Sequence, residues 1–569
     1  MTPSARILIF EAASSIGGTW SKDRLYPQLK SNNVLGMYEF SDFPMDTETY
    51  GLKPEQHIPG TIIHRYLTNY AEKFGFYKKI QFNTKVETAE HRDGGGWIIT
   101  VTPSGGHSPA SDKSQVLAAK LIVATGLTSD PFLPKIPDSE KFGAPIFHSK
   151  NMLEHAPMLE NAESTCILGC TKSGWDAVYA CVAAGNQVDW IIRESGHGPV
   201  WMSPPKVTPL KQFLEKLVLT RILSWFSPCI WGSMDGYPRI RQFLHGTWMG
   251  RFFVDKFWSV LRGDLVTLNQ YSAHLETKKL QPWTSPMFIG AGLSILNYDK
   301  NIFEFVRNGT VRVHVADITR LSSKTVHLSN GDEILTSALI CSTGWKHNPP
   351  LKFLPTGVDY GTPDQSETWA LPQPAALVNR ADEDIFLQLP RLKDQPLPNP
   401  KFKPLSEVSD VPLKDKTESF KLYRYIVPPK LIDSHDLAFA GSMLSISTSI
   451  CAQIQALWIT AYFHNEVPVS SDVEYETALY NRYAKWRTPV GFGARFPDFA
   501  FDSLPYYDML LRDLGLNPHR KRGAIANIFH SHGPQDYSGL VDEWMTKRLH
   551  PNLSQDTGLS KRPTDFTTI

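Results

Sequence analysis

Cysteine is scarce in this sequence, and its arrangement excludes several classes of protein. Only six of the 569 residues are cysteine, and no two of them form a Cys-x-x-Cys pair. A disulfide-stabilised fold, a redox-active dithiol and a structural zinc site all require cysteines that are more frequent or more closely spaced. We therefore expect a protein of a reducing compartment, the cytoplasm, without a metal site.

An excess of charge of one sign is also lacking. Lysine and arginine together number 58 and aspartate and glutamate 57, which leaves a formal net charge of +1. This balance excludes a nucleic-acid-binding protein that relies on bulk positive charge, and it excludes a chain kept disordered by its charge. The length predicts two to four domains, at about 150 residues per domain.

Long hydrophobic runs are missing too. Residues 214–234 are mostly apolar, but Lys216 and Arg221 interrupt the run and Pro228 would break a helix. We therefore do not expect a helix that spans a membrane. Residues 201–264, which hold five tryptophans, are expected to form a helical cap beside an apolar substrate cavity. A peripheral contact with a membrane is the alternative for this segment.

Short apolar runs that end in small residues indicate the buried strands of a parallel sheet. Residues 174–184 between two of these runs have the pattern of a short helix, which predicts a βαβ unit and an α/β fold. Residues 345–420 are rich in proline and predict irregular coil. The strand-like runs lie at residues 6–10, 120–126, 165–169, 187–193, 338–343 and 437–441.

The turn inside the βαβ unit resembles a nucleotide-binding fingerprint. Gly169 and Gly174 match the first and third glycines of the Gly-x-Gly-x-x-Gly pattern, whose backbone amides hold a pyrophosphate. Thr171 stands in place of the second glycine, and Ser173 lies in the same turn. Arg193 follows about 20 residues later, where an arginine favours the 2′-phosphate of NADPH. The alternatives are an ordinary glycine at a helix start and a solvated arginine at a strand end.

Six short patches stand in a fixed order between residues 5 and 465. They are Phe10-Glu11 with Ile16-Gly17-Gly18-x-Trp20, Tyr26-Pro27 with Leu29 and Asn32, Ala124-Thr125-Gly126, Phe142 with His148-Ser149, Ser342-Thr343-Gly344-Trp345, and Phe439-Ala440-Gly441 with Gln455. Together they resemble the flavin-containing monooxygenases, more closely the fungal members that accompany secondary-metabolite pathways. A single patch is weak evidence, but six in this order are hard to obtain by chance.

The resemblance implies two Rossmann-like dinucleotide-binding domains. An NADPH-binding domain is inserted into a split FAD-binding domain, and a helical cap and a C-terminal extension complete the chain. The expected FAD domain comprises residues 1–145 and 346–465, the NADPH domain 146–200 and 265–345, the cap 201–264, and the extension 466–569 with a disordered tail.

The resemblance further implies an FAD- and NADPH-dependent monooxygenase. Such an enzyme inserts one oxygen atom of O2 into a small hydrophobic organic substrate through a flavin C4a-hydroperoxide. Glu11 then holds the adenosine ribose, Asn32 lies beside the peroxide, and His148 belongs to a motif that couples the domains; a purely structural role is the alternative for each. The other implied cofactor-binding residues are Gly17, Gly18, Trp20, Thr125, Gly126, Thr343, Gly344, Gly441 and Gln455.

One part of the family pattern is expected to be missing. The ribose-binding acid normally follows a glycine-rich turn by about 20 residues, but only ten residues precede Glu11. We therefore expect the first βα unit of the FAD domain to be absent. Either the sequence begins too far downstream in an active enzyme, or the chain is a shortened, non-catalytic relative that binds NADPH or a partner.

The kind of oxygenation stays open. The signature around His148 is similar to that of Baeyer-Villiger monooxygenases, but Met152 stands where those enzymes have a tryptophan. Baeyer-Villiger insertion, hydroxylation and oxygenation at nitrogen or sulfur are all compatible with the sequence. A pyridine nucleotide-disulfide reductase shares the fold, but it needs the cysteine pair that this chain lacks.

Overall fold

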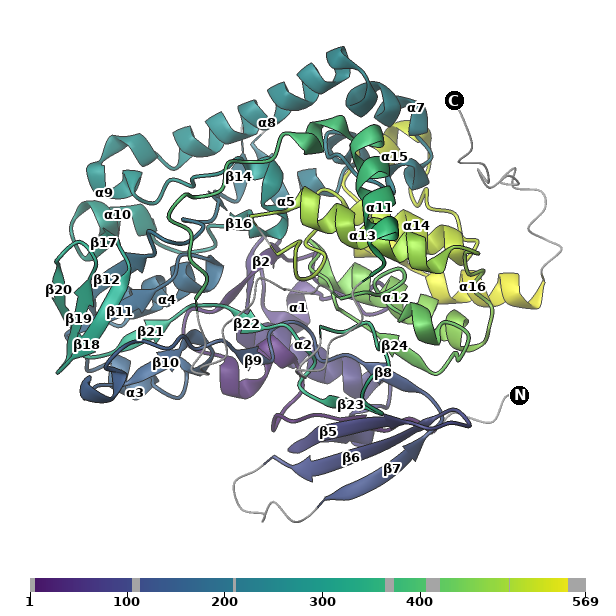
Figure 1. Ribbon diagram of the computed structural model, residues 1–569, viewed down its shortest axis with the longest axis horizontal. Helices are drawn as coiled ribbons and strands as arrows, with labels where there is room; N and C mark the ends of the chain where they lie inside the picture. Colours follow the sequence, from purple (N-terminus) through teal and green to yellow (C-terminus); the bar gives the residue numbers. More distant parts are fainter. Residues whose placement is uncertain are drawn as a thin grey trace.

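A computed structural model describes residues 6–104, 113–207, 211–363, 373–405, 420–490 and 492–550 of the chain. Its central feature is a five-stranded parallel sheet, with a small antiparallel sheet beside it (Figure 1). The parallel sheet has the order β10 (Ile146–His148), β21 (Leu339–Cys341), β11 (Ser164–Leu168), β12 (Gln187–Ile192) and β17 (Val311–Val315). The antiparallel sheet consists of β18 (Ile318–Ser322), β19 (Thr325–Leu328) and β20 (Glu333–Leu335).

The predicted βαβ unit forms the middle of this sheet. β11 and β12 pair in parallel, and α4 (Lys172–Ala183) connects them. The sheet face is covered by aromatic packing, because Trp175 of α4 meets Trp190 of β12 edge to face, with ring centroids 4.9 Å apart. Both tryptophans are fully buried, as is expected for a parallel sheet whose faces are covered by helices. The predicted βαβ unit is confirmed.

The strands of the predicted FAD region form separate small sheets. β1 (Ile9–Phe10) pairs with β4 (Ile80–Gln81), and β8 (Leu121–Val123) pairs with β24 (Leu437–Phe439), both in parallel. Among the residues that the structure describes, no strand joins these two pairs. A four-stranded sheet beside them contains β23 (Lys352–Leu354), β5 (Thr84–His91), β6 (Trp97–Pro103) and β7 (Ser114–Ala118).

Short pairs of strands and short helices complete the α/β part of the molecule. The antiparallel pairs are β2 (Lys30–Val34) with β3 (His57–Pro59), β22 (Trp345–Lys346) with β9 (Asp130–Pro131), and β14 (Lys206–Val207) with β15 (Gln212–Phe213). β13 (Met202–Ser203) and β16 (Ser294–Ile295) pair in parallel. The helices here are α1 (Thr47–Tyr50), α2 (Gly60–Lys73), α3 (Ala156–Leu159), α9 (Leu275–Lys278) and α10 (Ile302–Arg307).

The predicted cap is helical, and it packs with the C-terminal segment into one body. Arg221 of the cap and Asp508 of the C-terminal segment form an ion pair in which both side chains are fully buried. The cap contains α5 (Leu214–Val218), α6 (Arg221–Ser224), α7 (Pro238–Arg241) and α8 (Trp248–Leu268). The cap packs against α13 (Val473–Arg487), α14 (Ser503–Asp513) and α15 (Ala524–Phe529), and α12 (Thr448–Phe463) and α16 (Leu540–Leu549) complete this helical part of the molecule. No helix in the described part of the chain is long and apolar enough to cross a membrane.

The prediction of irregular coil for residues 345–420 is wrong in part, because α11 (Ala375–Gln388) lies within it. Prolines stand before this helix, at the N-cap Pro374, and after it, but none interrupts its 14 residues. Asp382 of α11 accepts hydrogen bonds from Arg482 and Trp486 of α13, at 2.7 Å each. Tertiary contacts thus hold a helix that the local proline content obscures. The predicted disordered tail, residues 551–569, lies outside the described residues.

Candidate functional site

The loop between β11 and α4 is held in a shape that only glycine permits. Gly169 has a φ of +112°, and a Cβ atom there would lie 2.3 Å from the carbonyl oxygen of Ser342. A Cβ atom at Gly174 would lie 2.3 Å from the carbonyl oxygen of Gly169. The side chain of Thr171, the N-cap of α4, makes no capping hydrogen bond, and Ser173 lies in the first turn. The backbone amides at such a helix start suit a phosphate group.

Arg193 lies at the same edge of the sheet as this loop, because it directly follows β12. Its guanidinium donates a hydrogen bond to Ser195 Oγ at 2.8 Å and lies 3.6 Å from the Asp317 carboxylate. Partial burial lowers the pKa of Arg193 from its ordinary value. Arg193 is therefore held in one orientation by protein groups at the position predicted for recognition of a 2′-phosphate.

Asn32 lies in β2, and a polar bridge connects this strand to the phosphate loop. Asn297 Nδ2 donates hydrogen bonds to the carbonyl oxygens of Lys30, at 3.1 Å, and Ser31, at 2.9 Å. Lys172, inside the nucleotide fingerprint, donates from Nζ to Asn297 Oδ1 at 3.1 Å. Lys172 also forms an ion pair with Asp176 of α4. The structure therefore couples the predicted NADPH loop to the strand that carries Asn32.

Glu215 of α5 holds the other end of the same strand. Its two carboxylate oxygens accept hydrogen bonds from Asn33 Nδ2 and from the backbone N–H of Val34, the latter at 3.0 Å. The side chain is 4% exposed, and burial raises the pKa of Glu215 to about 7. A carboxyl group that titrates near neutral pH therefore contacts Asn33, the residue next to Asn32.

We expect the buried Glu215 to make the stability of the protein depend on pH. Between its ordinary pKa of 4.5 and the raised pKa of about 7, the folded chain keeps a proton that the unfolded chain has lost. The free energy of unfolding therefore falls as pH rises through this window, by about 3 kcal/mol. Urea unfolding of the Glu215→Gln variant, measured across the window, is expected to show that much less dependence on pH.

The exposed Glu48 supplies a matched control for this experiment. Glu48→Gln removes a carboxylate from the surface and is expected to leave the pH dependence of unfolding as in the unmodified protein. Equal pH dependences for the Glu215→Gln variant and the unmodified protein would contradict the assignment of a raised pKa to Glu215.

Two polar side chains beside this bridge have buried atoms without a hydrogen-bond partner in the described residues. They are Asn32, through Oδ1, and His57 of β3, whose ring nitrogens lie beside the backbone of Asn32 and Asn33 without a well-formed hydrogen bond. Burial lowers the pKa of His57, which favours the neutral form of its ring. Buried polar atoms normally have partners, and orphaned ones point to an unseen ligand or water. Asn32 and His57 can therefore offer neutral hydrogen-bonding groups to a bound molecule.

His148 and the turn after β21 form a second cluster. His148 Nδ1 accepts a hydrogen bond from the backbone of Lys150 at 3.1 Å, whereas Nε2 is buried without a partner in the described residues. The ring meets Trp345 edge to face at 4.8 Å, and burial lowers the pKa of His148 to about 4. Thr343 donates to the carbonyl oxygen of Phe132 at 2.6 Å. A neutral imidazole thus lies beside the strand end that contains Thr343 and Gly344.

The loop after β1 contacts the loop after β8. Thr19 Oγ1 and Thr128 Oγ1 lie 3.0 Å apart, which brings the segment containing Gly17, Gly18 and Trp20 next to that containing Thr125 and Gly126. Gly17 has a φ of +119°, and a Cβ atom there would lie 3.0 Å from the backbone of Trp20. These two predicted cofactor-binding segments are therefore neighbours.

Glu11 and Gln455 already have partners within the protein. Glu11 Oε1 accepts a hydrogen bond from Ala13 N at 2.9 Å, and burial raises the pKa of Glu11. Gln455 is fully buried; its Oε1 accepts from Gly441 N at 3.0 Å and its Nε2 donates to Tyr506 Oη at 2.9 Å. Gln455 therefore ties the turn after β24 to α14, while its role toward a cofactor stays a prediction.

The sequence did not single out four residues around strand β2. They are Lys172 and Asn297, which form the bridge to this strand, and His57 and Glu215, which lie beside it. Lys172 stands inside the fingerprint itself, so a closer reading of that loop had a signal to find. Asn297, His57 and Glu215 lie in segments without a recognisable motif, and they approach Asn32 only through the fold.

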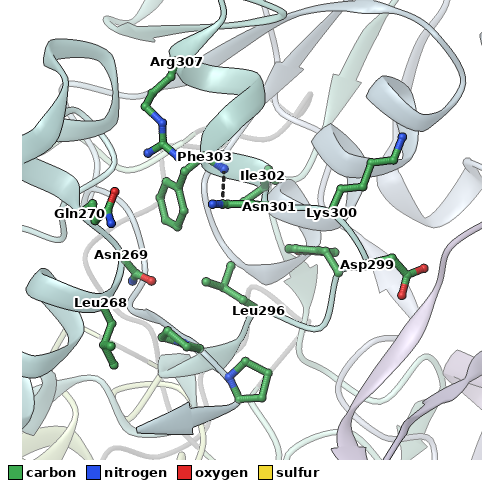
Figure 2. Close-up of a pocket in the computed structure, with 13 residues that line it drawn as sticks. Leu268, Asn269, Gln270, Leu296, Asp299, Lys300, Asn301, Ile302, Phe303 and Arg307 are labelled. Carbon is green, nitrogen blue, oxygen red and sulfur yellow. Dashed lines mark hydrogen bonds between the residues drawn. The ribbon is translucent and has the colours of Figure 1, made fainter. Parts of the chain in front are cut away.

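A cleft of about 320 Å³ lies beside α10 (Figure 2). At its rim the backbone N–H of Phe303 donates to Asn301 Oδ1 at 3.0 Å, which caps the helix. Lys300 and Arg307 add positive charge to the lining, which also contains Leu296. None of the predicted site residues lines this cleft. Two of its lining residues nevertheless contact the Asn32 site, because Tyr298 Oη accepts a hydrogen bond from Lys172 Nζ at 3.3 Å and Asp299 pairs with Lys30 of β2 at 2.5 Å.

Comparison with known proteins identifies the family. A family model described as flavin-binding monooxygenase-like matches residues 6–221. The FAD-dependent monooxygenase resA of Aspergillus sclerotiorum is 34% identical over 96% of this chain and 94% of its own length. The chain belongs to the flavin-binding monooxygenase-like family. Another fungal member, the FAD-dependent monooxygenase DEP4 of Alternaria brassicicola, is 29% identical over 98% of this chain and 94% of its own length.

Solved structures show the same fold at low sequence identity. The closed structure of cyclohexanone monooxygenase superimposes with a TM-score of 0.56 and 14% identity, over 89% of this chain and 92% of that one. An oxidised steroid monooxygenase bound to NADP gives a TM-score of 0.56 at 13% identity, over 89% and 92% of the two chains. The predicted α/β fold class is confirmed, and the enzyme class predicted from the sequence patches, a flavin-dependent monooxygenase, is confirmed by the fungal relatives.

Proposed function

We propose that this flavin-dependent monooxygenase uses NADPH and O2 to oxygenate a small hydrophobic organic molecule in fungal secondary metabolism. The observation that carries the proposal is the bridge from Lys172 through Asn297 to the strand that holds Asn32. When bound, FAD would supply the chemistry that takes a hydride from NADPH and activates O2. Reduction of the flavin requires the nicotinamide of NADPH to lie next to the flavin ring. A connection between the nucleotide loop and the Asn32 strand would hold the two binding sites in a fixed relative position.

We propose contacts from the residues present to both cofactors, but assign none to the FAD pyrophosphate, whose glycine-rich turn is expected to be missing. For NADPH, Gly169 and Gly174 leave room for a pyrophosphate at the start of α4, and Arg193 can pair with a 2′-phosphate. For FAD, Glu11 can accept hydrogen bonds from the ribose, and the neighbouring loops of Gly17 and Gly126 allow close approach of the backbone. The remaining residues proposed to contact the cofactors are Gly18, Trp20, Thr125, Thr171, Ser173, Thr343, Gly344, Gly441 and Gln455.

Asn32, His57 and His148 are proposed to act as neutral polar groups. An amide and two uncharged imidazoles can hold a reactive oxygen species by hydrogen bonds without supplying a strongly acidic proton. Their burial, which favours the neutral form of both histidines, also excludes water from their surroundings. Asn32 and His148 keep the roles predicted from the sequence, and His57 is added to them.

The near-zero net charge and the apolar cap favour an uncharged organic substrate. Four of the five tryptophans in the cap are buried, so the cap is a packed body and not a loose lid. We place the enzyme in the cytoplasm, where a peripheral contact with a membrane would bring it to substrates dissolved in the bilayer. No nucleic acid partner is proposed.

Replacing Arg193 with alanine tests the assignment of NADPH. The variant is expected to raise the KM for NADPH by about tenfold to a hundredfold and to leave the KM for NADH within about twofold, because NADH lacks the 2′-phosphate. The measurement is steady-state oxidation of each nucleotide by the FAD-loaded enzyme. Arg312→Ala is the matched control, because it also removes an arginine paired with an aspartate, here Asp189 of β12 in the parallel sheet. Equal changes for both nucleotides would contradict the proposal.

A further inference from the structure

Helix α8 has an apolar stripe on the side that faces away from the protein. Trp248 is 74% exposed, Phe252 53% and Phe253 47%, and Met249 and Val260 are exposed as well. At about 100° per residue, these five side chains fall within one arc of roughly 140° on the helix surface. Four of the five stand in the first two turns of α8, and Val260 lies about two turns further on, beyond Lys256.

The opposite side of the same helix is apolar too. Val254, Trp258 and Leu265 are buried there, and Trp258 donates a hydrogen bond to the carbonyl oxygen of Phe226 at 3.0 Å. A surface helix of a globular protein needs only one apolar stripe, the one that faces the core. The outward stripe of α8 therefore does not contribute to the folding of this chain, and its exposed aromatic side chains call for a partner.

The position of the stripe favours a flat partner. α8 runs along the outer edge of the molecule as its longest helix, at the top of the view in Figure 1. A protruding helix edge offers no groove into which a protein side chain could insert, but it can lie in the plane of a lipid surface. Tryptophan and phenylalanine are the side chains typical of helices that lie in a membrane interface.

The charges around the stripe favour anionic lipids. Arg251, Lys256 and Arg262 of α8 are positively charged, and Lys256 Nζ lies 5.7 Å from the ring centre of Phe252, inside the stripe. Of the two acids in α8, Asp255 is engaged by Arg391 at 2.6 Å, and Asp264 has a partner as well. The exposed Arg239 adds a further positive charge just before α8. The surface therefore combines aromatic side chains with net positive charge, although the whole chain is nearly neutral.

We propose that the outward stripe of α8, formed by Trp248, Met249, Phe252, Phe253 and Val260, docks onto the surface of a membrane that contains anionic lipids. The aromatic side chains enter the headgroup boundary, and the adjacent Arg and Lys side chains bind lipid phosphates. This docking rests on the proposed peripheral contact and names its surface and its lipid class. It is tested without NADPH, O2 or substrate, so its failure would leave the monooxygenase function untouched.

The experiment is sedimentation of the purified full chain with vesicles. One set is made of phosphatidylcholine alone, and the other also contains phosphatidylserine. We expect at least about tenfold more protein bound to the anionic vesicles at low salt, with the difference reduced at high salt. The triple variant W248S/F252S/F253S is expected to lose at least about tenfold in binding to both sets. The matched control is I525S/F529S, which removes two exposed apolar side chains from α15 and is expected to bind like the unmodified protein.

Three outcomes would overturn the proposal. One is an unmodified chain that binds neither set of vesicles, and another is a triple variant that binds as well as the unmodified chain. The third is an unmodified chain that forms a concentration-dependent dimer and does not bind vesicles, while the triple variant stays monomeric. That result would assign the stripe to a contact with a second copy of the chain. Because the three side chains are exposed, the melting temperature of the triple variant is expected to change little, which separates loss of docking from loss of fold.

Discussion

Replacing Arg221 with alanine is expected to lower the free energy of unfolding by about 3 to 5 kcal/mol, which is a large share of the stability of a typical domain. Arg221 Nη2 donates to Asp508 Oδ1 at 2.9 Å and to the carbonyl oxygen of Pro518 at 2.8 Å. Alanine would leave the fully buried Asp508 carboxylate without its cation. Urea unfolding followed by circular dichroism measures the loss, and Asp508→Ala is expected to have an effect of similar size.

An exposed ion pair provides the control for this prediction. Lys430 and Glu474 lie 2.5 Å apart, but both side chains are more than half exposed, so Lys430→Ala is expected to cost less than about 1 kcal/mol. If Arg221→Ala costs no more than Lys430→Ala, the conclusion that the cap and the C-terminal segment fold as one body would be wrong. That conclusion matters for function, because Glu215 and the Asn32 strand rely on the same cap.

Replacing Gly169 with alanine is expected to weaken NADPH binding by at least about a hundredfold. The new Cβ atom would lie 2.3 Å from the carbonyl oxygen of Ser342, a backbone atom that cannot move alone, and the residue would keep a φ of +112°. The loop must therefore shift, and its backbone amides would no longer converge on the phosphate. Isothermal titration calorimetry of the FAD-loaded protein with NADP+ measures the dissociation constant.

Gly185 separates the clash at Gly169 from the cost of an unusual backbone angle. It follows the same helix α4 and has a φ of +94°, but a Cβ atom there would meet nothing within 4 Å. Gly185→Ala is expected to lower stability by about 1 kcal/mol and to leave NADP+ affinity unchanged. NADP+ affinity that is equal in the two variants would show that the loop after β11 does not hold the nucleotide.

Much of the nucleotide-binding architecture could be predicted from the sequence, because parallel strands leave strong local signals. The apolar runs ending in Gly169 and Arg193 predicted β11, α4 and β12 to within two residues. Buried strands need continuous apolar residues, and the turn between them needs glycine, so both requirements are visible in the chain itself. The family resemblance then supplied Asn32 and His148, which no local pattern distinguishes from ordinary polar residues.

The rest of the site depends on contacts between distant segments. Glu215 looks like an ordinary acid at the start of a cap helix, and only the fold places it against Asn33, 182 residues away in sequence. Asn297 likewise reaches Ser31 across 266 residues. The helix α11 was missed for a similar reason, since its packing against α13 outweighs the proline-rich context. Such pairings follow from topology, and a single sequence carries no local trace of them.

The most direct test of the proposed mechanism is to follow the visible absorbance of bound flavin in the purified protein. The protein is loaded with FAD, mixed with NADPH in the absence of oxygen, and then exposed to O2. We expect NADPH to bleach the flavin band, NADH to do so much more slowly, and O2 to restore the band. A protein that retains FAD but is bleached by neither nucleotide would contradict the claim that the Lys172–Asn297 bridge joins an NADPH site to a flavin site.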